Sequence, residues 1–246
     1  MDFANILFGG PCNRSCPFCI GKQLPAALQA NNLDRYPLLG QQQFVDAVLE
    51  RGIGQVVMTG TVTDPQLYRH ESRLLDDLRR QLPGRQFSLH TNGVLALRKL
   101  DEFNAYDRVC LSFPSFRSPT YRRLMGSARV PDLAQIVARA LVPVKVSCVL
   151  TPDNLPELEE FLENCSALGI RRLVLRQLFL PSGAAVPWEL PQGLTLQGYY
   201  RANPVYAWKQ MEVTCWDFRK SESQSLNLFP DGTLSSRYLL SEAEVV

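Results

Sequence analysis

The chain has 246 residues, of which 46% are apolar and 20% are charged, and its net charge is +2. This is the composition of a globular protein with one large core or two small ones. The dispersed Lys and Arg residues do not favour a nucleic-acid surface, and no stretch approaches the roughly 18 apolar residues of a membrane span. Seven cysteines, an odd number in a chain too long to need stapling, and a first segment unlike a signal peptide lead us to expect a cytoplasmic protein without membrane or nucleic-acid partners.

Short apolar runs alternate with amphipathic stretches over the first 180 residues. The runs lack polar alternation, which is typical of strands buried on both faces, and strands joined by helices form parallel sheets. Six strand–helix units are too few for a closed eight-stranded barrel, so the predicted fold class is α/β, a (βα)6 partial TIM barrel. The expected strands are 5–8, 55–58, 87–89, 109–113, 144–150 and 173–175.

The clearest helical stripe runs from Leu155 to Leu168. Asn154 and, three residues later, Glu157 resemble a capping box, which predicts that the helix begins after Asn154. Gly169 is a natural residue just beyond its last turn.

The pattern changes after Pro181. Residues 182–204 carry turn signals and are predicted to be irregular, whereas 225–240 are predicted to form a hairpin around a Pro-Asp-Gly turn. We therefore expect a barrel over residues 1–180 and a short C-terminal extension over 181–246 that packs on it and is not an independent domain.

Polar or glycine residues follow nearly every predicted strand. In folds of this kind, ligands bind at the carboxyl ends of the strands. A loop without a functional role is usually polar too, but six polar strand ends at the same edge of the sheet favour a ligand-binding site.

Three cysteines, Cys12, Cys16 and Cys19, follow the first predicted strand with C-x3-C-x2-C spacing. A structural zinc site is one alternative, but it takes four ligands, usually from two paired knuckles, and the other four cysteines are isolated. A cubane iron–sulfur cluster also normally takes four thiolates, so three leave one iron open to another ligand. Because only Cys215 lies beyond residue 180, we expect a single cluster.

The segment from Cys12 to Cys19, CNRSCPFC, resembles the motif of the radical S-adenosylmethionine (SAM) enzymes. The resemblance covers about residues 4–180, and the barrel is similar to that of the molybdenum-cofactor GTP cyclases, without their cysteine-bearing C-terminal region. It implies that Cys12, Cys16 and Cys19 hold three irons of an oxygen-sensitive [4Fe–4S] cluster, while SAM chelates the fourth. It also implies reductive cleavage of SAM to a 5′-deoxyadenosyl radical, with an electron donor such as flavodoxin or ferredoxin.

The resemblance also implies SAM contacts after the second strand, where the family has a Gly-Gly-Glu-Pro-like segment. The corresponding residues are Thr59, Gly60, Thr61 and Asp64, whose oxygens can accept from the SAM ammonium. Asp64 is shorter than the family's Glu and the spacing differs, so a plain Asp-Pro turn is the alternative. Phe18 is expected to border the adenine.

Further SAM contacts are implied at the ends of the later strands. Ser112 lies at the end of the fourth strand, Thr151 and Asn154 follow the fifth, and Arg176 follows the sixth. Helix capping fully explains Asn154 as an alternative. For Arg176 the alternatives are the SAM carboxylate, an anionic group of the substrate, or plain solvation.

The sequence therefore predicts a radical SAM enzyme that takes hydrogen from a small-molecule substrate. One alternative is an activase that makes a glycyl radical on a partner protein, since such activases are similarly short. The other is an iron–sulfur module that senses iron or redox state without turnover.

Overall fold

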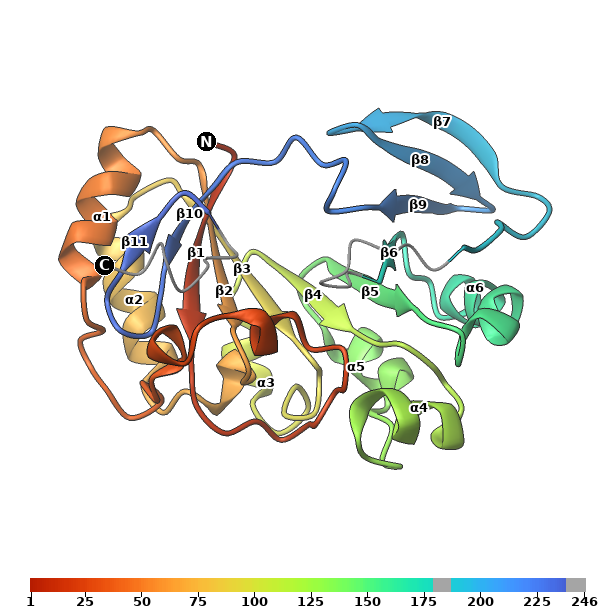
Figure 1. Cartoon of the computed structure of the whole chain (residues 1–246), viewed down its shortest axis with the longest axis horizontal. Coiled ribbons are helices and arrows are strands. Elements are labelled where there is room, and N and C mark those ends of the chain that lie inside the picture. The colour runs from red at the N-terminus through yellow and green to blue at the C-terminus, as the bar shows by residue number, and fades with distance from the viewer. Residues whose placement is uncertain (179–186, 238–246) are drawn as a thin grey trace. The chain divides into compact units, whose positions relative to one another are not determined.

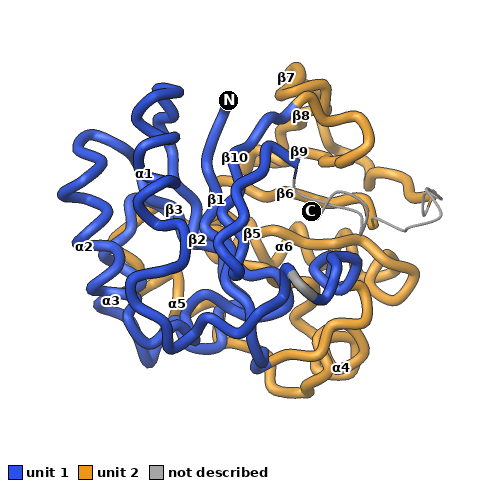
Figure 2. Tube along the Cα trace, turned by 60° about the vertical axis from the view of Figure 1, so that its left-hand side comes forward, with its two compact units in different colours: residues 1–13, 19–109, 223–246 blue, residues 14–18, 110–222 orange. Residues whose placement is uncertain are grey.

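The computed structural model describes residues 1–178 and 187–237. The chain forms two compact units, which Figure 2 shows in different colours. The first comprises residues 1–13, 19–109 and 223–246, and the second comprises 14–18 and 110–222. The chain passes from one unit to the other within the strand β4 (Arg108–Ser112).

The first unit contains a mainly parallel sheet with the strand order β11-β10-β1-β2-β3 (Figure 1). Strand β1 pairs in parallel with both β2 and β10, and only β11 is antiparallel. A buried hydrogen bond of 2.7 Å from Asn5 Nδ2 to Asn227 Oδ1 joins β1 to β10, 222 residues later. The elements are β1 (Phe3–Phe8), α1 (Gln41–Glu50), β2 (Gln55–Gly60), α2 (Glu71–Gln81), β3 (Gln86–Thr91), α3 (Leu100–Asn104), β10 (Ser225–Leu228) and β11 (Leu234–Ser235).

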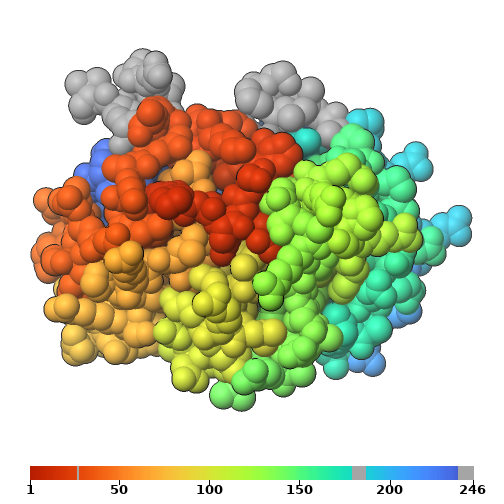
Figure 3. Space-filling view, turned by 90° about the horizontal axis from the view of Figure 1, so that it is seen from below, coloured from red at the N-terminus to blue at the C-terminus, as the bar shows by residue number. Residues whose placement is uncertain are grey.

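Apolar side chains of the helices cover this sheet. Phe44, Val48, Leu74 and Leu78 on α1 and α2 are fully buried, as the central residues of β1 and β2 are. In Figure 3, the atoms coloured orange to yellow, which belong to the chain segment that contains α1, α2 and β3, lie on the surface of the molecule. The sheet is therefore buried on its helical side, as expected for parallel strands.

The second unit continues the alternation and then changes to antiparallel strands, in the order β5-β6-β9-β8-β7. Strand β9 is parallel to β6, whereas β7, β8 and β9 form an antiparallel meander. The elements are α4 (Ser118–Met125), α5 (Leu133–Arg139), β5 (Val144–Leu150), α6 (Leu158–Ala167), β6 (Arg172–Gln177), β7 (Thr195–Tyr200), β8 (Asn203–Trp208) and β9 (Met211–Trp216).

All six predicted strands are present, as β1 to β6, each within three residues of the expected bounds. The predicted hairpin at the C-terminal end is also confirmed as β10 and β11, although residues 238–240 lie outside the described part.

The prediction that residues 182–204 are irregular is wrong from Thr195 onward, where β7 and β8 form a hairpin; residues 182–186 lie outside the described part. The turn between the strands is made by Arg201 and Ala202, both in the left-handed region with φ of 51° and 62°. Gly, Asn and Asp are the residues that normally mark such a two-residue turn. Because none of these residues stands at 201 or 202, the sequence lacks the turn pattern from which a hairpin is usually predicted.

No helix within residues 1–178 and 187–237 is long and apolar enough to cross a membrane.

Candidate functional site

The seven cysteines fall into two classes by exposure. All are free thiols, but Cys12, Cys16 and Cys19 are only partly buried, whereas the other four are buried. Burial raises the pKa of Cys148 far above its ordinary value, and it raises the pKa of Cys165 and of Cys215 to about 12. Metals bind thiolates, so the three motif cysteines are the thiols suited to hold one. Within either unit, no three His, Cys, Asp or Glu side chains of the described residues already lie together as a metal site.

In the first unit, the beginning of the cysteine loop is fastened to the ends of β2 and β3. Thr63 Oγ1 donates to the carbonyl oxygen of Pro11 at 2.6 Å, and Asn92 Nδ2 donates to Asn13 Oδ1 at 2.8 Å. Asn13 is the residue after Cys12, so these bonds set where the loop leaves β1.

The end of the loop packs on the same strand end. Cys19 Sγ lies 3.5 Å from the carbonyl oxygen of Thr61, and a Cβ on Gly21 would lie 2.0 Å from that oxygen. Thr61 itself donates from both its N–H and its hydroxyl to the carbonyl of Phe8. Gly60 is required for the turn, because a Cβ there would lie 1.8 Å from the carbonyl oxygen of Thr63.

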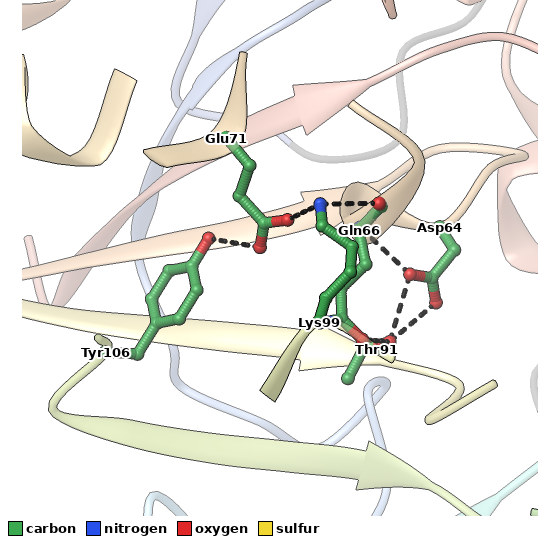
Figure 4. Close-up of polar contacts among 6 residues, drawn as sticks. All are labelled: Asp64, Gln66, Glu71, Thr91, Lys99 and Tyr106. Atoms are coloured by element: carbon green, nitrogen blue, oxygen red, sulfur yellow. Dashed lines mark hydrogen bonds and ion pairs between the residues drawn. The ribbon is translucent and has the colours of Figure 1, made fainter. Parts of the chain in front are cut away.

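Asp64 is buried at the centre of a hydrogen-bond network (Figure 4). Its Oδ1 accepts from the N–H of Gln66 at 3.0 Å, its Oδ2 accepts from the N–H of Asn92 at 2.7 Å, and the Thr91 hydroxyl donates to the same carboxylate. Burial raises the pKa of Asp64 above its ordinary value, although these bonds oppose the rise. The carboxylate thus braces the end of β2 against the end of β3 and caps the turn at 65–67.

A second buried polar layer lies beside Asp64. Lys99 pairs with Glu71 and donates to the carbonyl oxygen of Gln66 at 2.9 Å, and the Tyr106 hydroxyl donates to Glu71 at 3.0 Å (Figure 4). Burial raises the pKa of Glu71, while the charge of Lys99 opposes the rise. Each charged group of this layer is thus paired, which is the condition for a buried charged group to be tolerated, whereas Gln66 Nε2 is buried without a partner among the described residues.

In the second unit, the middle of the cysteine loop docks on α4. The N–H of Ser15 donates to the carbonyl oxygen of Met125 at 3.1 Å, and the Arg14 guanidinium lies over the Tyr121 ring, 5.6 Å from its centroid. Phe18 and Cys16 pack against the cluster of Tyr121, Leu124 and Met125, with Cys16 Sγ 3.4 Å from Met125 Sδ. Phe18, the predicted neighbour of adenine, therefore has one side occupied by α4.

Gly126 ends α4 in the left-handed conformation, with φ of 72°. A Cβ there would lie 1.9 Å from Ser15 Oγ, 3.1 Å from Ser15 Cβ and 3.3 Å from Ser15 N, so the Ser15 hydroxyl would have to turn away and the backbone that leads into Cys16 would be crowded. Gly169 has nearly the same φ, 76°, but nothing within 4 Å of an added Cβ.

We therefore expect Gly169→Ala to lower the free energy of unfolding by about 1–2 kcal/mol, the cost of a left-handed alanine. Gly126→Ala carries that cost as well as the collision with Ser15. It is expected to lose more stability in urea and to retain less iron after reconstitution than Gly169→Ala. Equal iron contents in the two variants would show that Ser15 does not set the position of Cys16.

The end of β5 corrects the capping prediction. The Asn154 side chain does not cap a helix; its Oδ1 accepts from the N–H of Thr151 at 2.8 Å, and its Nδ2 donates to the carbonyl oxygens of Pro114 and Val149. The α-helix begins four residues later, at Leu158. Asn154 thus closes the turn after β5. The carbonyl oxygens that it binds are brought beside it by the fold, so the sequence alone could not predict these bonds.

The remaining predicted contacts stand at strand ends. Thr59 is partly buried in β2, and Ser112 is the exposed last residue of β4. Arg176, in β6, donates from Nε to Ser147 Oγ at 2.7 Å. The sequence alone assigned no role to Thr63, Asn92 or Gly126. Of the three, Asn92 had one sequence feature that pointed to a role in the site, its position directly after a strand.

The comparisons with known proteins decide the family. The profile of the Radical SAM superfamily matches residues 6–171, which is more than half of the chain and includes the cysteine loop. The chain belongs to the radical SAM superfamily. This membership confirms the predicted fold class, an α/β partial barrel, makes the chain a radical SAM enzyme, and implies a [4Fe–4S] cluster, SAM, a substrate and a reductant.

Individual relatives of this radical SAM enzyme are distant. It is 26% identical over 167 residues to a GTP 3′,8-cyclase of Rhodococcus opacus (strain B4), covering 65% of this chain and 46% of the cyclase. Among solved structures, it resembles Streptococcus suis SuiB bound to S-adenosylmethionine, with a TM-score of 0.57, 18% identity, and coverage of 76% of this chain and 43% of SuiB.

A second solved structure, native anSMEcpe with bound AdoMet and a peptide, gives a TM-score of 0.54 at 18% identity, covering 73% of this chain and 51% of that one. At these identities the structures show the fold alone. The chain spans about half the length of the relatives it matches.

Proposed function

We propose that this radical SAM enzyme binds one [4Fe–4S] cluster through Cys12, Cys16 and Cys19 and acts on a small molecule. The exposure of the thiols carries the proposal, because the motif cysteines are partly exposed and the four others are buried. This donor set fits a cluster with one iron left to a non-protein ligand. When bound, the cluster and SAM supply a one-electron cleavage that yields a radical able to take hydrogen from the substrate.

The role of the chain is to position the cofactors and exclude water. The ends of the cysteine loop are held by Thr63, Asn92 and Thr61, and its middle is held by α4. Such fastening fixes ligand directions before a cluster binds, which lowers the conformational entropy lost on assembly.

For SAM we propose the strand ends predicted from the sequence as its contacts. These are Phe18, Thr59, Gly60, Thr61, Asp64, Ser112, Thr151 and Asn154; for Arg176 we propose the alternative, an anionic group of the substrate. Side-chain hydrogen bonds within the chain already engage Thr61, Asp64, Thr151 and Asn154, so the free capacity of these residues differs. The Thr61 hydroxyl and the Asn154 amide are used within the chain, whereas the Asp64 carboxylate retains further lone pairs.

The proposal of a small-molecule substrate is supported by the similarity to an enzyme whose name specifies GTP. The solved neighbours that contain peptides are too distant in sequence to support a peptide substrate. We propose flavodoxin or ferredoxin as the electron donor and the cytoplasm as the location.

Anaerobically reconstituted protein with dithionite and SAM is expected to release 5′-deoxyadenosine and methionine slowly, even without substrate. The small-molecule fraction of a cell extract should accelerate this release, because substrate binding completes the site and excludes water. Chromatography of the products measures both rates. Acceleration by the protein fraction alone would support the activase instead. A reduced cluster that binds SAM but yields no 5′-deoxyadenosine would support the non-catalytic sensor.

A further inference from the structure

The carboxyl ends of β6 and β9 lie side by side in the second unit. The two strands are parallel, and their register pairs Arg176 with Trp216. Figure 1 shows β9 between β6 and β8, so that its other edge pairs with the antiparallel strands β8 and β7. The predicted barrel therefore has an additional parallel strand whose carboxyl end adds residues that the six-strand pattern does not include.

Arg176 is held in a defined orientation at this edge. Its Nε donates to Ser147 Oγ on β5, and its guanidinium carbon lies 5.3 Å from the centroid of the Phe218 ring. A guanidinium fixed through Nε presents its two terminal nitrogens as a fork, the geometry that pairs with a carboxylate or phosphate. The nearby acid, Asp217, is already paired with Arg219 at 2.8 Å, which lowers the pKa of Asp217.

Three aromatic rings, those of Phe218, Trp216 and Tyr200, form a row of neighbouring rings beside Arg176. The Trp216 ring lies 6.3 Å from the Tyr200 ring and 6.1 Å from the Phe218 ring, centroid to centroid. Tyr200 and Phe218 remain 49% and 43% exposed, so part of this aromatic surface is not used for packing.

The backbone beneath the rings is fixed. Asn203, which is buried, accepts from the N–H of Asp217 at 2.7 Å and donates to the carbonyl oxygen of Arg201 at 2.8 Å. This amide joins the segment after β9 to the turn between β7 and β8. Phe218 and Tyr200 are thus exposed on rigid backbone.

The Trp216 indole supplies an independent observation. Its Nε1–H is buried and has no acceptor within residues 1–178 and 187–237. Buried donors are nearly always paired, since an unpaired one costs free energy. The unpaired indole N–H marks this edge as incomplete within the described residues, although its burial keeps it out of direct contact with a ligand in this structure.

We propose that the aromatic corner, made of Ser147, Arg176, Tyr200, Trp216 and Phe218, binds the substrate, and that the substrate carries a flat ring and a carboxylate or phosphate group. The assignment rests on the proposed function and specifies its substrate class. Arg176 binds the acid, and the rings stack on the flat portion.

Three simple probes test this class by anaerobic equilibrium dialysis against the reconstituted protein. 2-Naphthoate has a flat ring and a charge, 2-naphthamide has the ring without the charge, and cyclohexanecarboxylate has the charge without the flat ring. 2-Naphthoate is expected to bind about tenfold more tightly than 2-naphthamide, since a charge-assisted bond is worth about one such factor. It should also bind more tightly than cyclohexanecarboxylate, which keeps the charge but cannot stack on the rings.

Substitutions then locate the binding. Arg176→Gln should bring the affinity for 2-naphthoate down to that for 2-naphthamide, and Arg176→Lys, which keeps the charge, should retain part of the difference. Phe218→Ser, at an exposed position, should weaken both aromatic probes alike. Tyr199→Ser is the matched control, because Tyr199 is 72% exposed on β7 and points to the opposite face from Tyr200.

Equal affinity for 2-naphthoate and 2-naphthamide, or an Arg176→Gln protein that keeps the difference, would overturn the assignment. So would competition between SAM and 2-naphthoate, which would give Arg176 to the cofactor. Release of 5′-deoxyadenosine without substrate, measured on the same preparation, tests the proposed function separately, so failure of one is distinguishable from failure of the other.

Discussion

Replacing any one of Cys12, Cys16 or Cys19 by alanine is expected to abolish the [4Fe–4S] cluster. With two thiolates the chain could not hold three irons, and the described structure offers no open cysteine as a substitute, because Cys110, Cys148, Cys165 and Cys215 are buried. Iron and sulfide content after anaerobic reconstitution measures the effect. The unchanged protein should hold about four of each.

Cys110→Ala is the matched control, because it removes a thiol from a buried position in β4 and leaves the motif intact. It should keep a full complement of iron, although the lost packing lowers its stability. If Cys110→Ala loses as much iron as Cys16→Ala, or if protein purified without oxygen contains stoichiometric zinc, the assignment of the motif is wrong.

The parallel strands could be predicted because their signal is local. An uninterrupted run such as Val144–Leu150 needs burial on both faces, whatever its neighbours are, so the sequence alone identifies it. The hairpin of β7 and β8 was missed because its turn places Arg201 and Ala202 at positive φ, a conformation set by the pairing of the strands and not by the turn residues.

The cysteine motif could be identified from the sequence for a similar reason, since its ligands lie within eight residues. The residues that fasten it could not. Thr63 is 52 residues from Pro11, and Asn92 is 79 residues from Asn13, so only the pairing of β1, β2 and β3 brings them together. Asn154 shows the same limit, because its capping pattern was outweighed by carbonyls of Pro114 and Val149 that the fold places beside it.

Asp64 combines a structural role, which the hydrogen bonds define, with a proposed role in binding the SAM ammonium. Asp64→Asn keeps the shape but replaces one acceptor oxygen by an NH2 group, which leaves the buried N–H of Gln66 or of Asn92 without a partner. An unsatisfied buried donor costs about 1–3 kcal/mol, so the free energy of unfolding in urea should fall by that amount. Thr91→Val is the matched control, since it removes the hydroxyl that donates to Asp64 and leaves the carboxylate in place.

The two roles separate when SAM affinity is compared with stability in both variants. If Asp64 only braces the ends of β2 and β3, Asp64→Asn and Thr91→Val should weaken SAM binding to the same small extent. If it also accepts from the ammonium, Asp64→Asn should lose a further factor of about ten to a hundred in SAM affinity, because a hydrogen bond to a charged group contributes about 1.5–3 kcal/mol.

Thr59→Val should weaken SAM binding as well, while the iron content of all three variants stays full. We expect the larger loss for Asp64→Asn, since the carboxylate keeps lone pairs that its internal donors do not occupy. SAM affinities that are unchanged in both Asp64→Asn and Thr59→Val would leave Asp64 with its structural role alone.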